Sequence, residues 1–274
     1  MVLVDRYLRL LGVERTPPGI DSLNELVQRH LCRVPFENVS KLLLVGREGA
    51  GRSVALEEFL DGIEHLDLGG TCYSANPFLA WLLGELGYDA CLMGADMSKP
   101  DVHTSIRVRR DGREYHVDVG YGGPFYRPIA LDRLPHEIVE GPLRYVFGTA
   151  GDGSYSMSVF SGSERRHGYV VHGPPRPRGY FDPIVLGSFQ PGQTFLGCLR
   201  VVRHFTDHAV ELTNTRLARH RGAGSVETTL RNMSELRAAV ENELAMPRCP
   251  IEEAVAVLER LTGRPFFEIG NYAA

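Results

Sequence analysis

One cysteine stands where the chain could place a reactive thiol. Cys72 follows Gly69-Gly70-Thr71 and precedes an apolar run that starts at Pro77 and keeps helical spacing until Gly87. Pro77 is expected in the first turn of this helix, where a missing N–H costs no hydrogen bond. The free amides and positive dipole end of the helix would favour a thiolate on Cys72. The alternative is a buried cysteine that packs as a small apolar side chain.

A base for this thiol is expected on a hairpin. Asp111-Gly112 is a strong turn signal between two alternating patterns. A turn that pairs Arg110 with Arg113 makes His103 and Asp118 diagonal neighbours on one face, with backbones roughly 7–8 Å apart. An aspartate so placed can hold the imidazole in the tautomer whose other nitrogen faces a thiol. A purely structural hydrogen bond between the two is the alternative.

The same hairpin carries a second histidine, His116. In this register it lies opposite Arg107, whose charge disfavours the imidazolium that a thiolate requires, so His103 is the predicted base. The residues of the opposite face are expected to point toward a core: Thr104, Ile106, Val108, Tyr115, Val117 and Val119.

Helical patterns dominate the first third of the chain. Apolar residues recur at helical spacing in 2–11, in the segment after Asp21 or Ser22, and in 54–63. Asp21 or Ser22 is a suitable N-cap for the second of these helices. Together with the helix after the cysteine, these segments predict a small helical bundle over residues 1–87 that carries the nucleophile.

After Gly87, apolar and polar residues alternate in short segments separated by turns. This pattern predicts a β-rich region over residues 88–187 that carries His103 and Asp118. The strand candidates are 88–95, 103–110, 114–119, 143–147, 155–160 and 167–171. The Pro/Gly-rich segment 173–179 is expected to be a connection or a lid. Strands at 199–204, 209–212 and 225–230 and helices at 234–244 and 250–261 are expected in a last unit, residues 188–274. The predicted fold class is therefore α+β.

Composition narrows the function class. The 274 residues carry a formal net charge of -4 and short, unclustered basic runs, which do not indicate a nucleic-acid partner. No apolar run approaches the roughly 20 residues of a membrane span. Five scattered cysteines without a C-x-x-C pair or a secretory leader predict reduced thiols and a cytoplasmic protein. No metal site is predicted, and nothing in the sequence indicates the oligomeric state.

Four motifs, taken together, resemble the arylamine N-acetyltransferases. They are Arg33-Val-Pro-Phe-Glu-Asn38, the cysteine loop Gly-Gly-Thr-Cys-Tyr-x-x-Asn, the segment His-Val-Asp-Val-Gly-Tyr-Gly-Gly, and Leu212-Thr-Asn-Thr-Arg-Leu217. The resemblance implies a helical bundle, a central β-barrel and a C-terminal α/β lid. It also implies a Cys72, His103 and Asp118 triad arranged as in papain-like proteases and transglutaminases.

The resemblance implies double displacement from acetyl-CoA, a cosubstrate, to an arylamine, arylhydrazine or N-hydroxyarylamine, with no tightly bound cofactor and a role in xenobiotic metabolism. The family positions that line the acceptor pocket correspond to Phe36, Tyr121 and Phe195, and Thr104 and Gly122 are also expected at the substrate site. Phe36 and Phe195 have ordinary core packing as the alternative. Tyr121 stands where the family usually has Phe, and its hydroxyl is expected to alter the acceptor preference.

Three other functions are compatible with parts of the sequence. An amide synthase of the same chemistry would release a carrier-bound polyketide as a macrolactam, a cysteine hydrolase would use the same triad with water, and a non-enzymatic binding protein would keep a vestigial site. The chain also departs from the family pattern. Leu68 replaces an arginine before the two glycines, and Ser74 replaces a glutamate two residues after the cysteine. These departures bear on the substrate and leave the triad intact.

Overall fold

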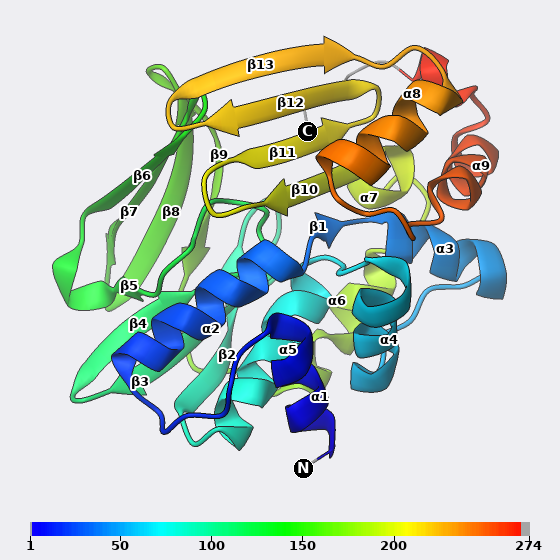
Figure 1. The fold of residues 1–274 in the computed structure, drawn as a ribbon. Coiled ribbons are helices and arrows are strands. Elements are labelled where there is room, and N and C mark those ends of the chain that lie inside the picture. Colours follow the sequence, from blue (N-terminus) through cyan, green and yellow to red (C-terminus); the bar gives the residue numbers. More distant parts are fainter. Residues whose placement is uncertain (1, 270–274) are drawn as a thin grey trace.

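Two sheets and a series of helices make up the protein in a computed structural model that describes residues 2–269 (Figure 1). The larger sheet has eight strands and forms a nearly closed, barrel-like surface, and the smaller has five. Most of the N-terminal helices lie beside the larger sheet, and the C-terminal helices lie beside the smaller one (Figure 1). The predicted mixture of helix and sheet is confirmed.

Five helices occupy most of the first 85 residues: α1 (Val2–Leu11), α2 (Ile20–Arg33), α3 (Val39–Glu48), α4 (Leu56–Leu66) and α5 (Cys72–Glu85). α1, α2, α4 and α5 bury their apolar faces in one cluster, which also receives Ile106, Val108, Val117 and Val119 from the predicted hairpin. The inward-facing side of the hairpin is therefore confirmed at these four positions. This shared cluster fixes the helices against the strands that carry the polar face.

The larger sheet contains β2 (Asp89–Asp96), β3 (His103–Arg110), β4 (Arg113–Val117), β5 (Ile129–Ala130), β6 (His136–Glu140), β7 (Leu143–Gly151), β8 (Ser154–Ser161) and β9 (Glu164–Val171). Its order is β5-β4-β3-β2-β9-β8-β7-β6, and the pairing of β2 with β9 joins the two halves. Arg110 pairs with Arg113 and Arg107 with His116, so the predicted hairpin register is confirmed.

The smaller sheet is built from β1 (Phe36–Glu37), β10 (Arg200–His204), β11 (Ala209–Thr213), β12 (Arg216–Arg221) and β13 (Gly224–Thr229), in that order. β1, from the N-terminal segment, pairs with β10 near the C-terminal third (Figure 1). α8 (Met233–Ala238), the π-helical turn η3 (Ala239–Glu243) and α9 (Ile251–Thr262) close a second apolar cluster over this sheet.

Short helical turns complete the chain. They are η1 (Leu131–Arg133), η2 (Arg178–Phe181), α6 (Asp182–Gly187), α7 (Thr194–Gly197) and η4 (Phe266–Glu268). η2 and α6 follow the Pro/Gly-rich segment and return the chain to the N-terminal helices, where Phe181 and Val185 join the first apolar cluster. No helix among residues 2–269 combines the length and the apolar character needed to cross a bilayer.

Several boundaries differ from the sequence prediction. α5 begins at Cys72, so the prediction that Pro77 lies in its first turn is wrong. The turn before Pro77 contains polar residues with partners in the fold, and the apolar period therefore starts late. α2 begins at Ile20 with Gly19 as its N-cap, so neither Asp21 nor Ser22 caps it. Instead, the Ser22 hydroxyl lies 2.7 Å from the hydroxyl of Tyr88.

Among the elements without a counterpart in the predicted segments are α3, β6 and β12. Each is short, and charged or polar residues interrupt its apolar pattern. α3 owes its place to burial of Val39, Leu42 and Leu43 against α9, a contact between distant parts of the chain that local periodicity does not reveal.

Candidate active site

The site is built around the first residue of α5. Cys72 is 7% exposed, and Thr71 precedes it as the N-cap in extended conformation. The predicted position of this cysteine at a helix entrance is thus confirmed. The Thr104 hydroxyl of β3 donates to the Cys72 carbonyl oxygen at 2.7 Å and fixes the helix start against the sheet. Gly120 allows the same approach, because a Cβ there would lie only 2.6 Å from the Cys72 Cα.

His103 and Asp118 meet across the hairpin, as the register predicts. His103 Nε2 lies 2.7 Å from Asp118 Oδ2, and both side chains are almost fully buried. Since Nε2 is occupied by the carboxylate, Nδ1 is the nitrogen that remains for a thiol. The contact between these two residues is confirmed, while their chemical roles belong to the proposal below.

Asp118 is held by three further donors. The Asn76 amide donates to Oδ1 at 2.9 Å, the Gly120 N–H donates to Oδ1 at 3.0 Å, and the Tyr169 hydroxyl donates to Oδ2 at 3.0 Å. The Tyr169 ring also stacks on His103, with ring centres 4.9 Å apart. A carboxylate with this many donors is stable in its ionised form and cannot rotate away from the imidazole.

Electrostatics favour an ionised site. Burial alone would lower the pKa of His103, but the negative charges of Asp118 and Cys72 raise it to about 10. Burial would raise the pKa of Asp118, but the positive charge and hydrogen bond of His103 lower it to about 2. The imidazole is therefore a cation at neutral pH, flanked by the carboxylate and the sulfur.

His116 is excluded as the base by its surroundings. Its Nδ1 lies 3.0 Å from the Tyr155 hydroxyl and its Nε2 lies 2.8 Å from the Tyr169 hydroxyl, so both ring nitrogens are engaged. Burial lowers its pKa to about 4. His116 is consequently neutral at working pH and orients the tyrosine that supports Asp118.

The aromatic residues predicted at the substrate site lie in two adjoining groups. Phe36 and Phe195 meet edge to face with ring centres 5.7 Å apart, and Gly122 lies against Phe36, since a Cβ there would be 3.2 Å from that ring. Tyr121 meets His103 edge to face at 5.5 Å, and its hydroxyl bonds to His167. The fold thus brings Phe36, Gly122 and Phe195 together and places Tyr121 beside His103.

Comparison with known proteins identifies the family. The family model described as N-acetyltransferase matches residues 19–247 of the chain. The curated relatives found with it are arylamine N-acetyltransferases. The chain belongs to the arylamine N-acetyltransferase family.

The similarity to individual arylamine N-acetyltransferases is moderate. The pineal gland isozyme of Gallus gallus is 32% identical over 41% of this chain and 40% of its own length, and arylamine N-acetyltransferase 1 of Homo sapiens is 26% identical over 47% of each. These matches span less than half the length of the curated relatives. The structural similarity covers more of the chain than the sequence similarity does. The enzyme of Mycobacterium marinum in complex with CoA gives a TM-score of 0.79 at 21% identity, covering 94% of this chain and 99% of that one. The enzyme of Salmonella typhimurium gives 0.78 at 18% identity, with 95% and 99% covered.

The two departures from the arylamine N-acetyltransferase pattern occupy different surroundings. Leu68 is buried and packs in the second apolar cluster. Near it, Glu37 is fully buried and accepts hydrogen bonds from the amides of Ser40 at 2.8 Å and Gly69 at 3.1 Å. No cation within residues 2–269 forms an ion pair with Glu37, and burial raises its pKa. Ser74, by contrast, lines a cavity together with Thr71 and Tyr73, the two neighbours of Cys72 in the chain.

Sequence reasoning missed three residues of the site. Asn76 belongs to the cysteine motif and lies four residues after Cys72, so it is expected on the same helix face. Its hydrogen bonds to Asp118 and Thr104 could not be predicted, because only the three-dimensional structure brings these residues together. Tyr169 lies on β9, and the pairing of β9 with β2 brings it to the site. Lys41 lies on α3, an element whose position the sequence did not indicate.

Removal of the Asn76 amide is expected to destabilise the fold. Its Nδ2 donates to the Thr104 carbonyl at 2.5 Å and to Asp118, and its Oδ1 accepts from the Val119 N–H at 2.9 Å, all fully buried. Asn76→Ala leaves these groups unpaired, at a cost of about 3 kcal/mol in the free energy of unfolding. Denaturant unfolding checks this value.

Asn242→Ala, which removes an exposed hydrogen bond to the Ala238 carbonyl, is the control and should change the free energy of unfolding by less than about 1 kcal/mol. Equal losses in both variants would contradict the structural role of Asn76.

Proposed function

We propose that the protein is an acetyl-CoA-dependent acetyltransferase that carries the acetyl group on Cys72 and passes it to an arylamine, an arylhydrazine or an N-hydroxyarylamine. The observation that carries the proposal is the 2.7 Å bond between His103 and Asp118 beside a cysteine at the start of α5. The names of the relatives and the CoA bound to the Mycobacterium marinum structure support the choice of donor and acceptor.

In the first half-reaction the Cys72 thiolate attacks the thioester carbonyl carbon of acetyl-CoA. The bond between that carbon and the CoA sulfur breaks, and the departing CoA thiolate takes the proton from the His103 imidazolium. In the second half-reaction an acceptor nitrogen or oxygen attacks the acetyl carbon on Cys72. His103 takes the acceptor's proton, and the Cys72 thiolate leaves. One acyl transfer is thereby divided into two steps with lower barriers.

The start of α5 supplies stabilisation for both steps. The first amides of a helix have no carbonyl partner within it, and the helix dipole is positive at this end. Amides so placed stabilise the thiolate and the oxyanion of the tetrahedral intermediate without moving during the reaction. The Thr104 bond to the Cys72 carbonyl holds this turn in place, so Thr104 serves the nucleophile rather than the substrate directly.

The aromatic group provides a place for a flat acceptor. Phe36, Phe195 and Tyr121 offer ring faces and edges, and the missing Cβ of Gly122 lets the Phe36 ring pack closely against the backbone there. As part of the proposal, the catalytic core corresponds to that of papain-like proteases and transglutaminases. The units 1–87, 88–187 and 188–274 are a helical bundle, a barrel and a lid.

The small cavity lined by Thr71 and Tyr73, the neighbours of Cys72 in the chain, favours a short acyl group over the carrier-bound polyketide of an amide synthase. The cavity flanked by Thr71, Tyr73 and Ser74 has a volume of about 50 Å³, enough for a few heavy atoms. Membership of the acetyltransferase family disfavours a hydrolase.

Steady-state kinetics test this function. With acetyl-CoA and an arylamine as the varied substrates, release of CoA should give parallel double-reciprocal lines, because CoA leaves before the acceptor reacts. Intersecting lines would indicate a direct transfer with both substrates bound and would contradict the acyl-cysteine route.

The rate of the acylation step is expected to depend on pH in a way set by His103. Its pKa is raised to about 10 by Asp118 and Cys72, so the folded protein keeps the imidazolium proton well above the pH at which a free histidine loses it. Acylation should therefore be nearly constant from pH 7 to 9 and fall as the pH rises through about 10. Rapid-quench acylation, corrected for spontaneous thioester hydrolysis, checks the profile, and an alkaline fall centred between pH 6 and 7.5 would contradict the assignment.

A further inference from the structure

A buried lysine lies beside the active site without an acidic partner. Lys41 is 8% exposed, its Nζ donates to the Ser188 hydroxyl at 2.6 Å, and it lies 4.1 Å from the centre of the Phe189 ring. The Ser188 hydroxyl donates its own proton to the Val185 carbonyl. No carboxylate among residues 2–269 forms an ion pair with Lys41. Because a buried charge is costly without a counter-charge, the missing anion is expected from a ligand.

Lys41 lines the cavity beside Cys72 together with Ser40, Thr71 and Ser74, and no acidic residue lines it. The hydroxyls of Thr71 and Ser74 have no hydrogen-bond partner in the described part of the chain, whereas the Ser40 side chain bonds to Glu37. Burial lowers the pKa of Lys41 to about 8, and the negative charge of Cys72 opposes that shift, so the amine is mostly protonated near pH 7. The cavity thus presents the Lys41 amine and the free hydroxyls of Thr71 and Ser74 close to the nucleophile.

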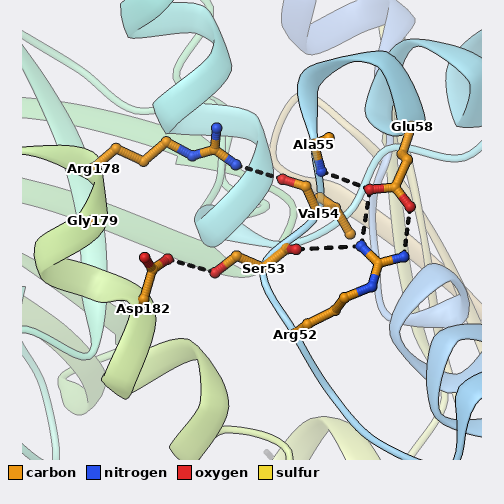
Figure 2. A pocket seen from close by; sticks show the side chains of 8 residues that line it. All are labelled: Arg52, Ser53, Val54, Ala55, Glu58, Arg178, Gly179 and Asp182. Atoms are coloured by element: carbon orange, nitrogen blue, oxygen red, sulfur yellow. Dashed lines mark hydrogen bonds and ion pairs between the residues drawn. The ribbon is translucent and has the colours of Figure 1, made fainter.

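The other cation that lines this cavity, Arg52, is already paired with carboxylates. Arg52 lines both this cavity and a larger one of about 370 Å³, and it is paired with Glu48 at 2.7 Å and Glu58 at 2.6 Å. Figure 2 shows the larger cavity, where Arg178 bonds to the Val54 carbonyl oxygen and Arg52 to Glu58. Of the two cations that line the smaller cavity, Lys41 is therefore the one without a carboxylate partner among residues 2–269.

The position and size of the cavity indicate which part of a thioester supplies the anion. In CoA or a carrier protein, the whole pantetheine arm separates the nearest phosphate from the thioester. In a malonyl or succinyl group, one or two methylene groups separate the second carboxylate from the thioester carbonyl. A cavity of about 50 Å³ has room for the few heavy atoms of such a carboxylate tail.

We propose that Lys41, with the hydroxyl of Ser74, binds the free carboxylate of a dicarboxylic acyl group, so that the enzyme accepts malonyl or succinyl thioesters as acyl donors. This inference rests on the acyl-cysteine function proposed above. The covalent step is unchanged: the bond from the acyl carbon to the donor sulfur breaks, the bond to the Cys72 sulfur forms, and the distal carboxylate takes no part in bond making. Ser74 is important to this proposal because a glutamate, usual in the family at this position, would form an ion pair with Lys41 and leave no free cation for the acyl group.

The test compares donors across variants. For the wild type, kcat/KM for CoA release with malonyl-CoA or succinyl-CoA should equal or exceed the value with acetyl-CoA. Lys41→Met should lower the ratio of dicarboxylic to acetyl donor by roughly 10- to 100-fold, because a charge-assisted hydrogen bond is lost. Ser74→Glu should lower the ratio similarly by pairing with Lys41. Arg52→Met removes a cation that is already neutralised, and it should leave the ratio unchanged.

Malonyl and acetyl thioesters of N-acetylcysteamine, which carry no phosphate, separate the two sources of negative charge. The dependence on Lys41 should persist with these donors. If Lys41→Met lowers all CoA donors equally and has no effect with the truncated thioesters, the lysine binds the carrier phosphates and the inference is wrong. An equal loss with every donor would show that Lys41 acts only on the thiolate, which also overturns it.

Failure of this inference differs from failure of the proposed function. If acetyl-CoA acylates Cys72 but the donor ratio is the same in wild type, Lys41→Met and Ser74→Glu, the carboxylate site is refuted and the acetyltransferase remains. If no donor acylates Cys72 in the wild type, the proposed function itself fails. Should Lys41→Met not fold, Ser74→Glu alone decides, since its change adds a carboxylate at the cavity wall and leaves the lysine in place.

Discussion

Cys72→Ala is expected to reduce acyl transfer by at least roughly 10⁴-fold, because removal of the nucleophile closes the covalent route and leaves only binding and the first amides of α5. The readout is the rate of acetylated arylamine formation with saturating acetyl-CoA. Cys91→Ala is the matched control, since Cys91 is a partly buried thiol on β2 whose sulfur donates weakly to the Arg107 carbonyl. This control should retain most of the activity. Retained transfer in Cys72→Ala would show that another group carries the acyl chain.

Asp118→Asn is expected to lower kcat/KM by roughly 10³- to 10⁴-fold, the size of effect seen when an orienting aspartate in a catalytic triad becomes an amide. The variant loses the charge that raises the pKa of His103 and faces donors from Asn76, Gly120 and Tyr169 with an amide in place of a carboxylate. The alkaline fall in acylation should move from about 10 toward lower pH, and alkylation of Cys72 at pH 7 should slow.

A second histidine–aspartate pair provides the control for Asp118. His172 Nε2 lies 2.7 Å from Asp96 Oδ2, the same distance as in the buried pair, but both side chains are partly exposed. Asp96→Asn should leave kcat/KM within a few-fold of the wild type, because an exposed pair contributes little. Equal activity losses in the two variants, or an Asp118→Asn variant with normal acylation and an unchanged pH profile, would contradict the orienting role of Asp118.

The contact between His103 and Asp118 could be predicted because both residues belong to one hairpin. The Asp111-Gly112 turn fixes the hairpin register, and the register places His103 beside Asp118 whatever the remainder of the chain does. The position of Cys72 at a helix start was likewise readable from the residues around it. The family motifs then connected the helix to the hairpin, which no local pattern could do.

What the sequence did not reveal depends on contacts between distant segments. Tyr169 reaches Asp118 only because β9 closes onto β2, and Lys41 reaches the cavity only because α3 packs beside the start of α5 and the segment after α6. The start of α5 was misplaced for a related reason. Asn76 is polar and therefore breaks the apolar period, yet it is fully buried because its partners Thr104 and Asp118 arrive from the hairpin. Periodicity reports burial of apolar surface and does not detect buried polar networks.

The smaller sheet shows the same limit on a larger scale. Phe36 and Glu37 appeared as part of a turn between helices, but they pair with Val202 and Val201 of β10. This pairing brings Phe36 to Phe195 across a sequence separation that no hydrophobic pattern encodes. The aromatic group near the active site therefore depends on assembly of the N-terminal segment with the C-terminal third.

The measurement that tests the central claim most directly is the intact mass of the protein after brief mixing with acetyl-CoA in the absence of an acceptor. The account predicts that the wild type gains the mass of one acetyl group, that peptide mapping places it on Cys72, and that an arylamine or hydrazine removes it. Cys72→Ala should gain nothing. If the Cys72 thiol reacts with a mild alkylating agent but neither acetyl-CoA nor malonyl-CoA nor succinyl-CoA labels it, the acyl-cysteine route from CoA thioesters is wrong.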